Sequence, residues 1–287
     1  MAIEGVLLDI DGTMCGRVWS AQGGDGIAPV VEEPYLEGQY LTGSKKHIQP
    51  PEWEDLELQF SLPLNRTVST WIRDWWQRRV KPRTVRLTAY DSVMNVIRSC
   101  EFQGAIITDM TVSALSSLSS ESVMLKLKIR PETVRIIPPS GTVRSAGMPQ
   151  PWLARNFRLD LSGLDAKGIF RIDSFTVKQS FVPDRYGGEL VVPGPLSFPN
   201  LTVRLQEQLA ATWQAWFDDF VVKGNNADTQ EKTGRLVLLD GALREGVRFD
   251  LFNVGIFRLT PSPWTYDDFP VVVAELYCER MDFTVLV

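Results

Sequence analysis

The stretch that decides the fold occurs twice, as PEWEDLELQFSLPLNRTVSTWIRDWW at residues 51–76 and as PLSFPNLTVRLQEQLAATWQAWFDDFVV at residues 195–222. In each copy, apolar residues first alternate with polar ones, as in a half-buried strand, and then recur at helical spacing. The helical stripe of the first copy consists of Leu64, Val68, Trp71, Ile72 and Trp75. The stripe of the second copy, 145 residues later, consists of Leu209, Trp213, Trp216, Phe217 and Phe220. Each copy therefore predicts a strand followed by one amphipathic helix.

Further blocks recur in the same order on both sides of this stretch, which indicates an internal repeat. Residues 8–12 match 159–163, residues 102–106 match 252–256, and residues 125–136 match 272–283. Between the copies, residues 137–151 are rich in Pro, Gly and Ser, as in a linker. The sequence therefore predicts a mainly β fold: two tandem β-sandwich or barrel domains, each with one amphipathic helix. The predicted boundaries are 1–138 for the first domain, 139–154 for the linker and 155–287 for the second domain.

Composition narrows the function classes. The 287 residues, 44% of them hydrophobic, suffice for two small cores, and nine Trp with fourteen Phe indicate dense cores plus subunit contacts. A net charge of -5 gives no global drive toward nucleic acid or anionic membrane. Three scattered cysteines and a single histidine, His47, argue against a disulfide framework and a metal site. We expect no cofactor, no metal, no signal peptide and no membrane insertion.

One local motif is typical of an enzyme. Residues 5–13, GVLLDIDGT, resemble the opening motif of the haloacid-dehalogenase-like phosphohydrolases. This resemblance implies a Mg²⁺-dependent enzyme with Asp9 as nucleophile and Asp11 as acid/base. Such enzymes need strands that alternate with helices, and the glycine-rich sequence after Thr13 has no helical stripe. Because the second copy has LDLSG in place of LDIDG, we interpret the motif as a strand and turn, and predict no enzyme.

With the copies aligned, the chain resembles the tail-tube protein family of contractile phages and contractile injection systems. The resemblance rests on LDIDG (8–12), Gly23-Gly24, Val30-Val31, TGSKK (42–46), IQPPEWEDLEL (48–58), Thr70-Trp71-Ile72 and Pro131-Glu132. It implies a small β-barrel with one helix, and rings in which subunits share an inner β-barrel. The long hairpins that reach neighbouring subunits would lie at roughly 17–50 and 178–197.

Two copies in one chain predict a homotrimer with pseudo-sixfold symmetry. This is the logic of a hub or adaptor that joins a sixfold tube to a threefold spike or baseplate, with DNA or an effector passing through the channel. A tube ring, an initiator ring, a cap and an unrelated carbohydrate-binding module remain alternatives. The particle would be a virion tail or an injection machine assembled in the cytoplasm. The candidate assembly-interface residues are Lys45, Lys46, Trp76, Arg78, Arg79 and Tyr186.

Overall fold

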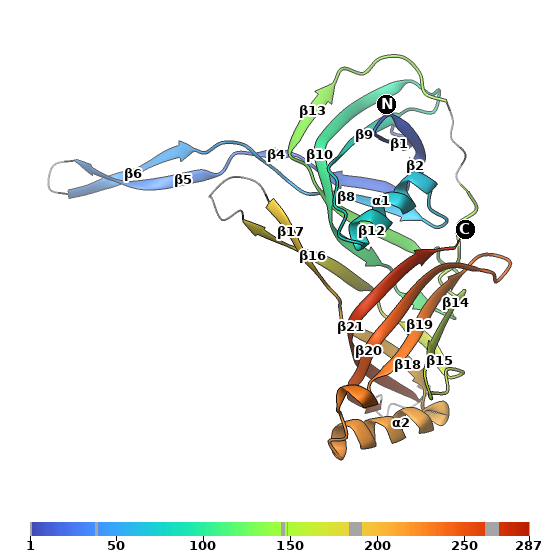
Figure 1. Cartoon of the computed structure of the whole chain (residues 1–287). Coiled ribbons are helices and arrows are strands. Elements are labelled where there is room, and N and C mark those ends of the chain that lie inside the picture. Colours follow the sequence, from blue (N-terminus) through green and yellow to red (C-terminus); the bar gives the residue numbers. More distant parts are fainter. Residues whose placement is uncertain are drawn as a thin grey trace.

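A computed structural model describes residues 2–37, 40–144, 147, 149–183, 191–261 and 270–286 (Figure 1). Its two α-helices are α1 (Arg66–Trp76) and α2 (Ala211–Phe217). The 3-10 turns η1 (Glu207–Leu209) and η3 (Asp228–Gln230) and the π-helical turn η2 (Asp218–Val222) lie around α2. Every pair of neighbouring strands in the described part of the chain is antiparallel, from the first pair in the sequence, β1 and β2, to the last, β20 and β21. The expectation of a mainly β fold is confirmed.

The first half of the chain contributes the strands β1 to β13. They are β1 (Gly5–Ile10), β2 (Thr13–Val18), β3 (Ser20–Gly23), β4 (Gly26–Ile27), β5 (Val30–Glu37), β6 (Tyr40–Ile48), β7 (Glu52–Trp53), β8 (Leu56–Ser61), β9 (Arg83–Tyr90), β10 (Val96–Val112), β11 (Leu115–Ser116), β12 (Met124–Arg130) and β13 (Thr133–Ile137). Seven of them follow the order β2-β1-β9-β10-β12-β8-β3, and β13 joins β10. Strand β10 is long enough to pair with β9 and β13 at its start and with β12 at its end.

The second half contributes the strands β14 to β21. They are β14 (Phe157–Leu161), β15 (Ile169–Ile172), β16 (Phe175–Pro183), β17 (Val191–Ser197), β18 (Leu201–Gln206), β19 (Lys232–Leu239), β20 (Glu245–Pro261) and β21 (Val271–Val285). Six of them form a sheet in the order β15-β18-β21-β20-β19-β14, which β11 of the first half extends at the β15 edge. Strands β16 and β17 instead join the sheet of the first half.

The helices cover one face of their sheets, as the sequence pattern predicts. The side chain of Asn65 caps α1 by accepting a hydrogen bond from the backbone N of Thr67. The buried side chains of α1 are Val68, Trp71, Ile72 and Trp75. Those of α2 and η2 are Trp213, Trp216 and Phe220. Leu209 does not follow the prediction. It lies in η1, before α2 begins, and is exposed because the chain turns there before the helix faces the sheet.

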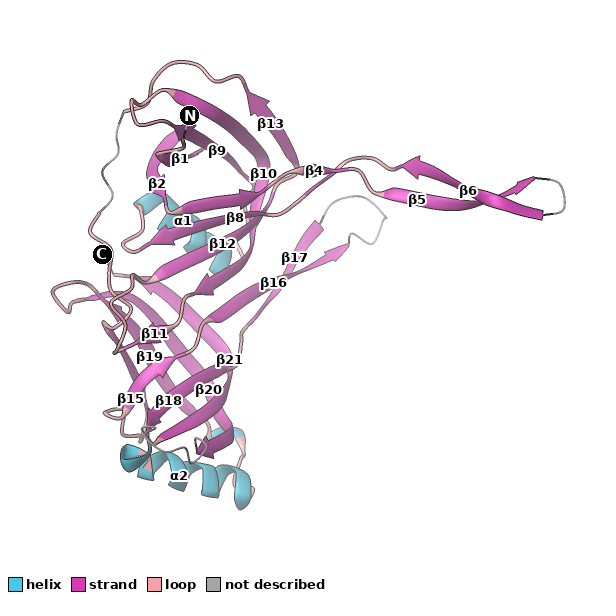
Figure 2. Ribbon diagram, turned by 180° about the vertical axis from the view of Figure 1, so that it is seen from behind, coloured by secondary structure: helices cyan, strands magenta, loops and turns pink. Residues whose placement is uncertain are grey.

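Two hairpins project from the same side of the molecule (Figures 1 and 2). Strands β5 and β6 form the longer one, and the short β4–β7 ladder connects it to the body. Strands β16 and β17 form the other. Both fall where the sequence predicts long hairpins. The tips, at residues 38–39 and 184–190, lie outside the described residues.

Candidate assembly surfaces

The two halves are joined by strand pairing. Residues 109–112 of β10 pair with residues 175–178 of β16, so the sheet of the first half continues into the second. The side chains of Thr111 and Thr176 meet across this ladder, with their hydroxyl oxygens 2.8 Å apart. Leu115–Ser116 of β11 pairs in turn with β15. We call these two ladders, with the aromatic cluster described next, the internal junction.

Trp76 forms the apolar centre of the internal junction. Its ring packs against Phe283, Phe198 and Phe249 of the second half, at centroid distances of 5.4, 6.0 and 6.1 Å. Its indole Nε1 donates a hydrogen bond to the carbonyl oxygen of Met281 at 2.8 Å. Only 8% of the residue is exposed. From the sequence, Trp76 is expected at an interface between subunits; in the structure its contacts join the two halves of one chain.

The end of the predicted linker also belongs to this junction. The backbone N of Trp152 donates to the carbonyl oxygen of Leu62, and its own carbonyl accepts from the backbone N of Val123. Its ring lies against Gly246 so closely that a Cβ there would fall within 1.9 Å of it. Trp152 and Ala154 are buried. The last residues of the linker are therefore fixed between the two halves.

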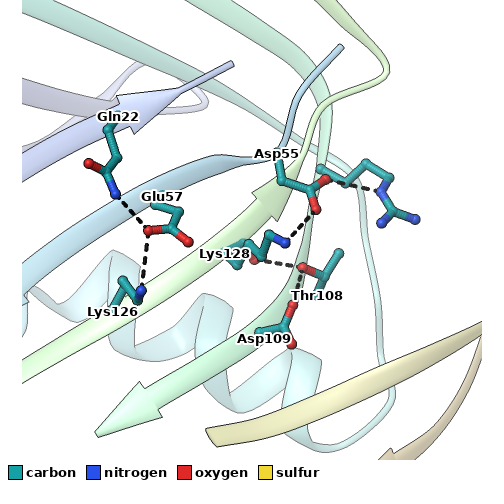
Figure 3. Close-up of polar contacts among 8 residues, drawn as sticks. Gln22, Asp55, Glu57, Thr108, Asp109, Lys126 and Lys128 are labelled. Carbon is teal, nitrogen blue, oxygen red and sulfur yellow. Dashed lines mark hydrogen bonds and ion pairs between the residues drawn. The ribbon is translucent and has the colours of Figure 1, made fainter. Parts of the chain in front are cut away.

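A polar network covers the face of the first-half sheet that is turned away from α1 (Figure 3). The carboxylate of Glu57 on β8 accepts a hydrogen bond from Gln22 Nε2 of β3 at 2.8 Å and pairs with Lys126 Nζ of β12 at 3.2 Å. The hydrogen bond from Gln22 and the charge of Lys126 together hold the pKa of Glu57 below its ordinary value. Glu57 therefore stays ionised at neutral pH, and the network keeps both signs of charge.

The same network continues across the neighbouring strands. Asp55 contacts Lys128 Nζ at 3.2 Å and Arg130 Nε at 3.1 Å, and the hydroxyl of Thr108 donates to Asp109 at 2.8 Å (Figure 3). On these strands polar side chains alternate with fully buried apolar ones. Alternation of this kind gives a sheet with one face in a core and one in water.

The matching face of the second half is also charged. Asp173 pairs with Arg204 at 2.9 Å and with Arg171 at 2.7 Å, and Arg258 pairs with Glu275 at 3.2 Å. Although burial alone would raise the pKa of Asp173, hydrogen bonds from both arginines lower it. Each half of the molecule therefore has a sheet face with polar side chains of both charges.

The structure separates the residues expected at the assembly interface. Lys45 and Lys46 are exposed on β6 in the long hairpin, where Lys46 Nζ pairs with Glu32 at 2.7 Å. Arg78 and Arg79 are exposed directly after α1, and Arg78 has a left-handed φ of 58° where the helix ends. These residues lie on different elements and do not form one patch. Tyr186 lies outside the described residues.

The two aspartates of the phosphohydrolase-like motif stabilise a turn. Asp9 Oδ1 accepts from the backbone N of Gly12 at 2.8 Å. Asp11 accepts from Arg83 Nη1 at 2.8 Å and from the backbone N of Thr84 at 2.9 Å, which ties the turn to β9. Asp11 and Gly12 have φ values of 53° and 81°, as a tight β1–β2 hairpin requires. Both carboxylates are therefore engaged in local structure on an antiparallel sheet, not at the carboxyl edge of a parallel one.

Three comparisons with known proteins bear on the fold. No protein-family model matches the sequence, and no curated protein matches it. Several solved structures do match. The likenesses are to parts of contractile injection systems.

The first is the sheath-tube complex of the PVC extracellular contractile injection system in the extended state, with 12% identity and a TM-score of 0.41 over 48% of this chain and 90% of that chain. The second is the tube-terminating cap of the anti-feeding prophage, with 16% identity and a TM-score of 0.41 over 48% of this chain and 90% of that chain. The third is the sixfold-symmetrised anti-feeding prophage baseplate, with 11% identity and a TM-score of 0.40 over 48% of this chain and 95% of that chain. Likenesses this distant assign no function to this chain.

Two further features concern the described residues. None of their helices is long and apolar enough to cross a membrane. They also hold no cluster of three His, Cys, Asp or Glu side chains that could bind a metal ion. The features that sequence reasoning missed are those of the internal junction, because pairing between distant strands leaves no local pattern in the sequence.

Proposed function

We propose that this protein is a non-enzymatic structural component of a phage tail or contractile injection system, and that its copies assemble into a ring around a channel. Within that role we propose a hub or adaptor that joins a sixfold tube to a threefold spike or baseplate. The ring would hold three chains, each with two tail-tube-like domains at 1–138 and 155–287. DNA or an effector would pass through the channel of the particle.

Matching backbone details support a tandem duplication. In the β9–β10 turn, Asp91 Oδ1 accepts from the backbone N of Val93 and of Asn95. In the β19–β20 turn, 149 residues later, Asp240 Oδ1 accepts in the same way from residues 242 and 244. Left-handed φ values also recur at this spacing, at Met94 and Leu243 and at Gly104 and Asn253. Two unrelated domains would have no reason to share such turns.

The observation that carries the proposal is the internal junction. Strand β16 of the second half extends the sheet of the first half, as neighbouring subunits of a shared barrel would do. Both halves have a polar sheet face, which suits the wall of an aqueous channel. When the same heterologous junction forms between successive copies, the copies close into a ring if the rotation from one copy to the next is a whole-number fraction of a full turn. Three chains with two halves each would give six near-equivalent positions.

Mass measurement and negative-stain microscopy of the purified protein test this proposal together. We expect particles of three times the 32.4 kDa chain mass, seen as closed rings with a central hole. A protein that stays a single chain up to about 100 μM, in several salt concentrations, would refute the ring. Rings with another number of chains would refute the hub but not the ring.

A further inference from the structure

We propose that the junction between two copies repeats the internal junction, with β4 of one copy pairing with the free edge of β20 in the next. The proposal rests on the ring-forming function and adds to it the partner surfaces and their register. It follows from the correspondence between the elements of the two halves. The partner is a second copy of this chain.

The accepting edge is the end of β20. In β10, residues 109–112 pair with β12 on one side and with β16 on the other. The equivalent residues 258–261 of β20 pair with β21 on the corresponding side, with the same bulge just before them. Within the described part of the chain, their other edge has no strand. A row of unpaired backbone groups is a template for another strand.

The donating edge is β4. Strand β16 carries residue Lys178 opposite Ser197 of β17, and β4 carries Ile27 opposite Glu52 of β7 at the equivalent positions. The second edge of β16 pairs with β10, whereas β4 has no second partner among the described residues. Transfer of the internal register places Asp25 opposite Thr260, as Thr176 lies opposite Thr111.

An apolar contact supports the same pairing independently. The position of Trp76 in α1 corresponds to Val221 in η2, and the position of Phe283 corresponds to Ile136 on β13. In the internal junction Trp76 and Phe283 stack on each other and are 8% and 7% exposed. Their counterparts Val221 and Ile136 are 38% and 76% exposed. The second half of one copy would therefore bring Val221 against Ile136 in the first half of the next.

A residue of β20 is likewise more exposed than its counterpart in β10. Thr108 of β10 is 3% exposed, and its counterpart Phe257 is 41% exposed. Three buried positions thus have exposed, apolar counterparts in the other half of the chain. Val221 and Phe257 lie on the second half and Ile136 on the first half, so the contact between two copies would bring these exposed apolar groups together, as is typical of an interaction site. All belong to the single contact that the repeated junction predicts.

Disulfide trapping tests the register. The variant Asp25→Cys with Thr260→Cys places two thiols opposite each other across the proposed contact. The matched internal control is Thr111→Cys with Thr176→Cys. The register control is Asp25→Cys with Leu259→Cys, because in the proposed register the side chains at these two positions point to opposite faces of the sheet. Native thiols interfere little, because Cys100 and Cys278 are buried and burial raises the pKa of Cys15 to about 11.

Mild oxidation followed by non-reducing electrophoresis gives the result. We expect the first variant to form reducible dimers and trimers, at least tenfold more than the register control, while the internal control closes within one chain. Rings without cross-linking, or with equal cross-linking in both, would overturn the proposed pairing and leave the ring function standing. Single chains without cross-linking would overturn both. Cross-linked open chains without rings would support the pairing and refute the ring.

Discussion

The internal junction is built from elements equivalent to those of two outer surfaces of the molecule, the β4 edge with Ile136 and the β20 edge with Val221. We call these two surfaces the open ends; only the junction is covered. At the junction, β16 pairs with β10 and Trp76 is enclosed by three phenylalanine rings. At the open ends, β4 and the last residues of β20 have one edge without a partner strand among the described residues, and Val221 occupies the position equivalent to Trp76. The stronger contact therefore holds one chain together, and the weaker version is left for assembly. This difference allows the chain to fold first and to associate afterwards.

The largest expected effect comes from emptying the internal junction. Trp76→Ala should lower the free energy of unfolding by about 3–5 kcal/mol, because it removes a buried indole and leaves a cavity. The hydrogen bond to Met281 is lost as well. Urea unfolding followed by circular dichroism measures the change. The matched control is Val221→Ala, which should cost about 0.5 kcal/mol or less in the single chain. Equal losses at both positions would contradict the difference between junction and end.

A smaller effect should follow from crowding the junction without removing a side chain. In Gly246→Ala, the added methyl group meets the Trp152 ring, so we expect a loss of about 1–3 kcal/mol of unfolding free energy. Gly241→Ala serves as the control, because nothing lies within 4 Å of a Cβ there. If both glycine variants unfold at the same urea concentration, Trp152 is not held between the halves.

At the open ends, a charge should weaken assembly without unfolding the chain. Ile136→Lys places an ammonium group in the proposed contact with Val221 of the next copy. We expect the protein concentration at half-assembly to rise by at least about tenfold, or about 1.4 kcal/mol, in sedimentation velocity. Val93→Lys, on a turn outside the contact, should leave assembly unchanged. A similar shift in both variants would point to net charge and not to the contact.

The smallest effect compares the two equivalent turns by pH. Burial alone would raise the pKa of Asp91, but hydrogen bonds from Asn95 and Val93 outweigh it and hold the pKa below its ordinary value of 3.8. The pKa of Asp240 is lowered by hydrogen bonds from Arg244 and Ala242. A lowered pKa in the folded state gives stability above pH 3.8 that is lost as the pH falls through the folded value.

Acid unfolding of two variants makes this comparison. Asp91→Asn and Asp240→Asn should each reduce the pH dependence below pH 4, and by similar amounts if the turns are equivalent. Thermal melting between pH 2.5 and 5 measures the slopes. A change in only one variant would argue that the two turns fulfil different structural roles.

Local patterns in the sequence predicted much of each half. The alternation in residues 56–61 and 201–206 became β8 and β18, and the stripe that contains Trp71 became the buried face of α1. The motif with Asp9 and Asp11 forms a hairpin turn, because both aspartate side chains accept hydrogen bonds from backbone N–H groups. These features depend on neighbours close in sequence.

What sequence analysis could not predict depends on contacts between distant residues. Trp76 lies beside the helical stripe, so its burial follows only from the aromatic rings of the second half. Trp152 directly follows the Pro-, Gly- and Ser-rich stretch at 137–151, which is typical of a flexible linker, yet the junction fixes it. The pairing of β10 with β16 joins strands about 65 residues apart, and strand register of this range has no local signal.

Hydrogen exchange on the assembled particle measures the pairing between copies itself, because backbone hydrogen bonds between copies must slow exchange at defined amides. The covered residues 109–112 of β10 provide the internal reference. We expect the amides of residues 258–260 and of Gly26–Ile27 to be protected to a degree similar to that of this reference. If they exchange as fast as exposed loop amides while residues 109–112 remain protected, the junction between copies is not the internal junction repeated.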